Sequence, residues 1–187
     1  HWKHRRQRQM CIRDRIFSIF CGLSGFIILY TLATPLSAFI ALSANLFYVF
    51  IYTLILKPRT NQNIVIGGAS GAAPVLIGWT ATGSELETGP WVLFLLVFMW
   101  TPAHFWALSI ENKSDYKNAQ FPMLPNEESY KRTCIFIAIY SCSTVLISLV
   151  AAPILQLGMV YLIVSILFGI NLMSVSYTHL RAHETHP

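Results

Sequence analysis

Charged residues are scarce in this chain of 187 residues, because Asp, Glu, Lys and Arg together make up only 11% of it. A soluble domain usually carries about 25% charged residues. Hydrophobic residues account for 55% of the chain, and the mean hydropathy is +0.54. This composition excludes an ordinary soluble domain and predicts an integral membrane protein.

The body of the chain also lacks net charge. Residues 1–15 hold six Lys or Arg and one Asp, which accounts for the whole formal charge of +5, and the two charges of residues 174–187 cancel. Residues 16–173 hold six bases and six acids. A nucleic-acid-binding domain needs a basic surface, so we expect no nucleic-acid partner.

The two ends differ from the rest of the chain. Five of the six histidines lie in them, and neither end shows helical periodicity. The strings QRQMCIRDR and SVSYTHLRAHET resemble translated sequencing-adaptor sequence. We therefore expect residues 1–15 and 174–187 to be non-native, and residues 16–173 to be an internal transmembrane fragment of a longer protein. For residues 1–15 the alternative is a genuine basic cytoplasmic arm.

Cysteine is rare, and no Cys-x-x-Cys pair is present among the four cysteines. Three lie outside the ends, at Cys21, Cys134 and Cys142. We expect free, buried thiols rather than a disulfide or a metal site.

Apolar segments of membrane-spanning length are abundant. Each has roughly 18–21 residues, enough at 1.5 Å per residue to cross a hydrocarbon core of about 30 Å. Helices satisfy the backbone hydrogen bonds within such a segment. We therefore predict an all-α, polytopic membrane helix bundle. Its six segments are 16–33, 36–56, 64–81, 91–110, 133–152 and 154–173, with breaks at Thr34-Pro35 and at Pro153.

Basic residues are unevenly distributed over the connections. From the first connection to the fourth, the Lys and Arg counts are zero, two, zero and four. The positive-inside rule places connections 57–63 and 111–132 in the cytoplasm and connection 82–90 outside. The two charged connections should therefore share one membrane face.

Connection 111–132 carries two carboxylates that can act together. Glu111 and Asp115 are spaced i, i+4, so on a helix they lie on one face. Two carboxylates with phosphate oxygens suit Mg²⁺. The alternative is a solvated helix end, with Lys113 and Lys117 as their partners.

Lys57 and Arg59 follow the second segment, in YTLILKPRT. They are either cytoplasmic anchors that reach the headgroups or a diphosphate site, in which Lys supplies a point charge and Arg a bidentate fork.

His104 is the only histidine outside the ends. It is either simply hydrogen-bonded near a helix end, or a haem-iron ligand or proton carrier. The small residues of segment 64–81 serve either close helix packing or a ligand.

Three strings are similar to the UbiA superfamily of membrane prenyltransferases, and within it to the branch that farnesylates haem. They are YTLILKPRTNQNIVIGGASGAAPVLIGW (52–79), WTPAHFWALSI (100–110) and DYKNAQFPMLP (115–125). The resemblance implies a nine-helix bundle, of which about six helices are present here. It also implies a bacterial plasma (inner) membrane location with a cavity that opens to the cytoplasm.

The resemblance further implies transfer of the farnesyl group of farnesyl diphosphate to a vinyl group of haem B, giving haem O. Mg²⁺ is the implied cofactor, and oxidase-assembly proteins such as a haem A synthase are implied partners. The implied catalytic residues are Tyr52, Lys57 and Asp115, and the implied metal ligands are Asp115 and Glu111. The implied substrate-binding residues are Lys57, Arg59, Asn63, His104 and Tyr116. Trp79, Trp100, Phe105 and Trp106 are candidates to stabilise an allylic cation or to pack on a porphyrin. The alternative is that most of them are packing or interface-belt residues.

One departure from the family is expected to matter. The first acidic motif of the family, of N-x-x-x-D type, is missing, so half of the Mg²⁺ site is absent and we expect this chain on its own to be inactive. Two other functions stay open. One is a prenyltransferase with a quinone precursor as acceptor, and the other is a non-enzymatic, haem-binding membrane subunit.

Overall fold

The computed structural model describes residues 2–112, 114 and 122–182, with side chains for 12–112, 114, 122–125 and 128–174. All regular structure in this part of the chain is helical. The elements are α1 (Trp2–Leu32), α2 (Pro35–Leu46), the π-helix η1 (Phe47–Leu56), α3 (Asn63–Ala81), α4 (Thr88–Glu111), α6 (Leu124–Glu127), α7 (Tyr130–Ile154) and α8 (Met159–Ala182).

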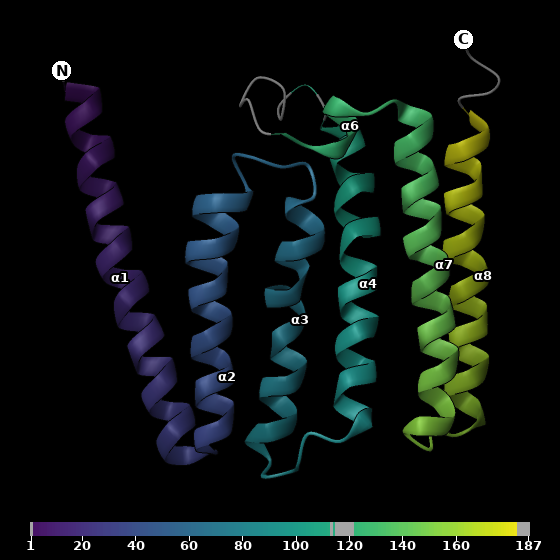
Figure 1. Ribbon diagram of the computed structural model, residues 1–187, viewed down its shortest axis with the longest axis horizontal. Helices are drawn as coiled ribbons and strands as arrows, with labels where there is room; N and C mark the ends of the chain where they lie inside the picture. The colour runs from purple at the N-terminus through teal and green to yellow at the C-terminus, as the bar shows by residue number, and fades with distance from the viewer. Residues whose placement is uncertain (1, 113, 115–121, 183–187) are drawn as a thin grey trace.

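The long helices stand side by side in one row, in chain order and with alternating direction (Figure 1). Each packs against its neighbours in the sequence: α1 on α2, α2 on α3, α3 on α4, α4 on α7 and α7 on α8. Five helical stretches have the length and apolar composition of membrane spans, and Met159–Ser174 is a shorter apolar stretch. The prediction of an all-α, polytopic membrane helix bundle is thus confirmed, and the chain is an integral membrane protein.

The predicted break at Thr34-Pro35 is confirmed by a capped helix start. The Thr34 hydroxyl accepts a hydrogen bond from Ser37 N at 3.2 Å and donates one to Thr80 O at 2.9 Å. Pro35 occupies the first helical position, where its missing N–H leaves no partner unsatisfied. The same threonine therefore starts α2 and ties it to the end of α3.

The predicted boundary at Pro153 is wrong by a few residues, because Pro153 lies inside α7. The helix ends instead in a Schellman motif, in which Leu157 N donates to Ala152 O at 2.8 Å and Gln156 N donates to Pro153 O at 3.4 Å. Gln156 takes the left-handed conformation that this motif requires, with φ of 53°. Glycine usually occupies the left-handed position of such a helix end, so a glutamine there does not predict the stop.

Helices α1 and α8 extend into both ends of the chain. Helix α1 begins at Trp2 and α8 continues to Ala182. Helical structure alone does not distinguish native from non-native residues, so the origin of residues 1–15 and 174–187 stays a prediction. The described cysteines are free, as expected, but only Cys134 is buried. Cys21 and Cys142 are exposed because they lie on helix faces that no described element covers.

A buried apolar cluster lies at the end of the row where α3 and α7 begin and α4 ends. It joins α3, α4, α7 and the short helix α6, which lies above α4 in Figure 1. Met123 and Leu124, from the end of the string DYKNAQFPMLP, are 7% and 1% exposed within it. The connection after α4 is thereby anchored to the helix ends at that face. The members of the cluster are Ile64, Ala103, Trp106, Met123, Leu124 and Ile137.

Candidate functional site

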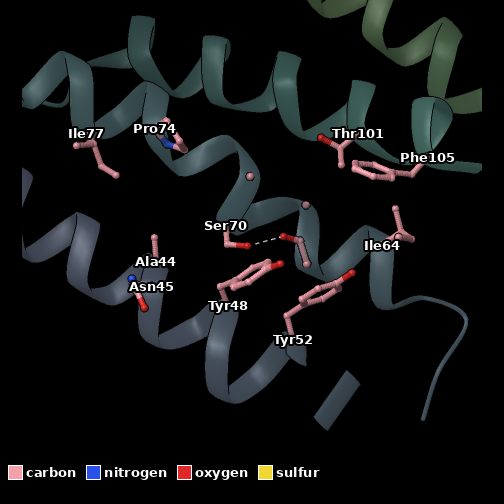
Figure 2. Close-up of a pocket in the computed structure, with 13 residues that line it drawn as sticks. Ala44, Asn45, Tyr48, Tyr52, Ile64, Ser70, Pro74, Ile77, Thr101 and Phe105 are labelled. Carbon is pink, nitrogen blue, oxygen red and sulfur yellow. Dashed lines mark hydrogen bonds between the residues drawn. The ribbon is translucent and has the colours of Figure 1, made fainter. Parts of the chain in front are cut away.

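A cleft of about 520 Å³ lies between α2 and η1 on one side and α3 and α4 on the other. We call it the first cleft. Its walls are mostly apolar and include three glycines of α3. Figure 2 shows the two tyrosine rings of η1 side by side, facing α3, with Thr101 and Phe105 approaching from α4. The lining residues used below are Tyr48, Tyr52, Gly67, Gly71, Thr101 and Phe105.

Tyr52 lies directly against the backbone of α3 at Gly67. A Cβ atom added to Gly67 would lie 3.1 Å from Tyr52 Cγ and closer still to two other ring carbons. No such contact exists at Gly71, where an added Cβ would have no atom within 4 Å. The ring of Tyr48 stacks behind Tyr52, with a centroid distance of 5.2 Å. The Tyr52 ring therefore packs directly on the backbone of Gly67.

The π-helix brings Tyr52 and Lys57 into one turn. Their spacing of five residues does not match the four of an α-helix, but Lys57 N donates to Tyr52 O at 2.8 Å. This i, i+5 bond is the π-helical pattern, and π-helical turns occur frequently at functional sites. Lys57 is half-buried, whereas Arg59 in the following turn is exposed. The predicted pair Tyr52 and Lys57 thus shares one π-helical turn, and Tyr52 lines the first cleft.

Asn63 joins the two charged connections. Its side-chain amide donates hydrogen bonds to Thr60 O at 2.7 Å and to Pro122 O at 3.2 Å. The residue is 1% exposed, and its Oδ1 has no hydrogen-bond partner in the part of the chain that the structure describes. The segment before α3 and the segment before α6 therefore lie at the same end of the row, as the charge pattern predicts. The predicted substrate-binding role of Asn63 stays a prediction.

His104 lies on an open face of α4, between two aromatic rings. Its ring stacks on Trp100 at 4.5 Å with an interplanar angle of 15°, and meets Phe105 edge-on at 5.4 Å. Among the described residues, none forms a hydrogen bond with the imidazole. Phe105 is one of the walls of the first cleft. His104 therefore lies next to a wall of that cleft, and its role as a hydrogen-bonded residue, a haem-iron ligand or a proton carrier stays a prediction.

The four aromatic candidates divide into two pairs. Trp106 is 1% exposed and packs with Tyr140 in the core, so it contributes to stability. Trp79 lies at the other end of α3, and its Nε1 donates to Glu85 O at 3.0 Å. Trp100 and Phe105 are 44% and 41% exposed beside His104. Only this second pair can contact a ligand near the imidazole.

The predicted metal pair is described only in part. Glu111 is exposed at the end of α4, and Asp115 and Tyr116 lie outside the described residues. Within the described part, no group of three or more His, Cys, Asp or Glu side chains could hold a metal. One exposed carboxylate does not make a magnesium site, so the fit to Mg²⁺ is not established and no reaction step below depends on it.

Sequence reasoning missed two contributors to the first cleft. Segment 64–81 is rich in small residues, but no sequence pattern shows that Gly67 faces Tyr52. The i, i+4 spacing of Tyr48 from Tyr52 is a usable signal for the second contributor. Together with Tyr52, these residues form part of the wall of the first cleft.

A row of membrane-spanning helices with such a cleft defines a membrane protein that can hold an apolar ligand. Comparison with known proteins makes this specific. The model of the UbiA prenyltransferase family matches residues 15–186. The chain belongs to the UbiA prenyltransferase family, as its resemblance predicts.

Curated relatives cover most of the chain. A protoheme IX farnesyltransferase of Paraburkholderia xenovorans is 41% identical over 171 residues, which cover 90% of this chain and 56% of the relative. Proteins of the same name from Synechocystis sp. and Cutibacterium acnes are 45% and 46% identical. Each covers 82% of this chain, which spans 49% and 46% of their lengths. The chain thus spans about half the length of these relatives. No solved structure matches it.

Proposed function

We propose that the protein containing this chain transfers the farnesyl group of farnesyl diphosphate to a vinyl group of haem B (protoheme IX), giving haem O. The observation that carries the proposal is the π-helical turn that holds Lys57 one turn from Tyr52, a residue that lines an apolar cleft. The names of the curated relatives support the choice of donor and acceptor.

The first cleft suits the prenyl donor. Its volume of about 520 Å³ lies within the usual range of about 300–1,000 Å³ for small-molecule sites. Gly67, Gly68 and Gly71 of α3 line the cleft, and because they have no side chain an isoprenoid chain can lie close to the backbone there. Lys57 then meets the diphosphate as a point charge, in a place less screened by water than that of Arg59.

The chemistry separates charge along the cleft. The bond between C1 of the farnesyl group and the diphosphate oxygen breaks, and both electrons leave with the diphosphate, whose growing charge Lys57 stabilises. The vinyl group of haem gives its π electrons to C1 and forms the new carbon–carbon bond. Water then adds to the cation left on the other vinyl carbon, and one proton is released.

We propose that the site also uses Mg²⁺, with Glu111 and Asp115 among its ligands. When bound, the ion would neutralise diphosphate charge. The measurement is the affinity of the chain for farnesyl diphosphate with Mg²⁺ and with EDTA. A gain of affinity with Mg²⁺ that Glu111→Gln reduces supports this part of the proposal, and equal affinities in both conditions would overturn it.

The proposed location is a bacterial inner membrane, with the first cleft opening towards the cytoplasm. Connections 57–63 and 111–132 carry all the Lys and Arg residues of segment 16–173. The positive-inside rule assigns such connections to the cytoplasm. Labelling of single cysteines placed at Arg59 and at Ser84, in intact cells with a reagent that does not cross membranes, tests this. The proposal expects labelling at Ser84 only.

The reaction is tested best in a chimera, because the chain spans about half the length of its relatives. Residues 16–173 replace the matching segment of the Paraburkholderia xenovorans relative, and the haem extracted from the membranes is identified by mass. We expect haem O. A prenylated quinone precursor in its place would favour the alternative acceptor. Unmodified haem would contradict the proposal, provided that the unaltered relative gives haem O in the same cells.

A further inference from the structure

The first cleft has a near end and a far end relative to Lys57. Helix α2 and η1 run towards Lys57, and α3 runs back in the opposite direction. Tyr52 and Ile64 therefore line the near end, and Asn45 and Ile77 line the far end. Figure 2 shows Asn45 and Ile77 at one side of the view and Ile64 at the other. A prenyl chain with its diphosphate at Lys57 thus extends towards Asn45.

Asn45 places an amide in the middle of a membrane span. It is the eleventh of the 22 residues of Pro35–Leu56, and it is the one amide among the described residues that line the first cleft. The lining hydroxyls of Ser70 and Thr101 each donate to a carbonyl of their own helix at 2.7 Å. Asn45 is exposed, and no described residue forms a hydrogen bond with its amide. At this depth an amide needs water or a polar partner, because burying it unpaired in hydrocarbon is costly.

The distance between Lys57 and Asn45 matches a chain of three isoprene units. The two residues are twelve positions apart, or ~18 Å at the α-helical rise, and the π-helical turns shorten this somewhat. An extended isoprene unit has four main-chain bonds and spans about 5 Å, on the scale of the peptide backbone, where three bonds span about 3.8 Å. Three units therefore reach about 15 Å beyond the diphosphate and four reach about 20 Å. A farnesyl chain ends near Asn45, and a geranylgeranyl chain passes it.

We propose that Asn45 sets the length of the prenyl chain that the first cleft accepts, and that it selects three isoprene units over four. A chain of three units stops at the amide and leaves it open to water, whereas a chain of four covers it and leaves it unpaired. The side chain stands on the side of the cleft towards α1, where its Nδ2 would lie 3.8 Å from a Cβ atom added to Gly22. This inference rests on the proposed function, in which an isoprenoid diphosphate occupies the first cleft.

The experiment uses the whole chain in phosphatidylcholine nanodiscs and three radiolabelled donors. Geranyl, farnesyl and geranylgeranyl diphosphate have two, three and four isoprene units. The quantity compared is the dissociation constant of geranylgeranyl diphosphate divided by that of farnesyl diphosphate. Partition of each donor into the bilayer is the same for every variant, so it cancels when this ratio is compared between variants.

Asn45→Leu tests the amide, because leucine is apolar and of similar size. We expect it to lower the ratio by about tenfold, since the longer chain then covers no unpaired amide. Farnesyl diphosphate binding should change little. Asn171→Leu is the matched control and should leave the ratio unchanged, because that amide lines a separate cleft between α4, α7 and α8.

Ala44→Phe tests the same level of the cleft by narrowing it. It should weaken the binding of farnesyl and geranylgeranyl diphosphate, while geranyl diphosphate keeps its affinity because its chain of about 10 Å stops short. Ser43→Phe is the control, since Ser43 is exposed and does not line the cleft. Gly71→Leu, which fills the cleft itself, should weaken farnesyl diphosphate binding, and Gly78→Leu, outside the lining, should not.

The outcomes separate this inference from the proposed function. An unchanged ratio in Asn45→Leu, or the same fall in Asn171→Leu, overturns the role of Asn45 and leaves the proposed function standing. Loss of geranyl diphosphate binding in Asn45→Leu shows that the amide supports the fold, and it also overturns that role. If the unaltered chain binds none of the three donors above the level of empty nanodiscs, the proposed function is contradicted and the inference falls with it.

Discussion

The Asn63 amide donates a hydrogen bond to the carbonyl of Pro122 at 3.2 Å, across a sequence separation of 59 residues. This bond joins the segment after Lys57 to the segment before α6. Both segments belong to the charged connections. The two halves of the proposed site are therefore held together by an uncharged side chain that is itself buried.

Asn63→Ala is expected to destabilise the chain. It removes both bonds of the side-chain amide. The carbonyl of Thr60 keeps the backbone bond from residue 63 N at 3.3 Å, but the carbonyl of Pro122 loses the amide as its donor, at a cost of about 1–3 kcal/mol. Thermal unfolding in detergent measures this effect. Asn112→Ala is the control, because that exposed amide only donates to Leu108 O of its own helix. Equal unfolding temperatures for the two variants would show that Asn63 does not hold the connections together.

Gly67→Ala is expected to displace the Tyr52 ring from its contact with α3. Overpacking of this kind typically costs roughly 1–3 kcal/mol, and the affinity for farnesyl diphosphate should fall with it. Gly71→Ala is the matched control, since its added methyl group meets open space, and it should be neutral or slightly stabilising.

A double-mutant cycle separates the ring contact from a general effect of alanine on α3. In a Tyr52→Ala background the added methyl group at Gly67 has no ring to meet, so Gly67→Ala should cost little in thermal unfolding. The same loss in both backgrounds would mean that the contact with Tyr52 is not the cause.

Lys57→Gln is expected to weaken farnesyl diphosphate binding by about tenfold, and Arg59→Gln by less than about threefold. The reason is exposure, because Lys57 is half-buried in the turn that closes η1 and Arg59 is exposed. The radiolabelled donor gives both affinities. Equal losses, or a larger loss at Arg59, would argue that the diphosphate does not lie at the end of the π-helix.

Ser148→Ala is expected to loosen α8 from α7 by about 0.6 kcal/mol, the average for such bonds in a bilayer. The measurement is the accessibility to a thiol reagent of a cysteine placed at Leu172 on α8, which keeps Ser165 in place, compared with and without the change at Ser148. Ser143→Ala is the control, since Ser143 donates only to Ile139 O of its own helix. Greater accessibility in both variants would show that the hydroxyl contact is not specific.

Much of the fold followed from the sequence because membrane helices need length and apolar composition above all. Segments such as 64–81 and 91–110 predicted α3 and α4 to within a few residues. The end of α7 was less predictable, because Gln156 adopts a conformation that glycine usually takes. The π-helix was not predicted either, since its wider turn has no residue signature.

The site followed from the sequence only where chemistry depends on residue type. Lys57, Tyr52 and His104 stand out by their charge or by their motifs. In the structure Tyr52 lines the first cleft, Lys57 is bonded to it through the backbone, and His104 contacts Phe105, which lines the same cleft. The cleft itself depends on which small residues face which rings, as at Gly67 and Tyr52. Such facing is a matter of tertiary packing and leaves no periodic trace in the sequence.

The account depends most on where the prenyl donor lies, and photocrosslinking measures that directly. A farnesyl diphosphate analogue with a photoreactive group at the far end of its chain is bound to the protein in nanodiscs, irradiated and mapped by mass spectrometry. We expect labelling within 64–77 of α3 and within 44–52, with loss of labelling in Gly71→Leu but not in Gly78→Leu. Labelling on α7 and α8, or labelling unaffected by Gly71→Leu, would contradict the account.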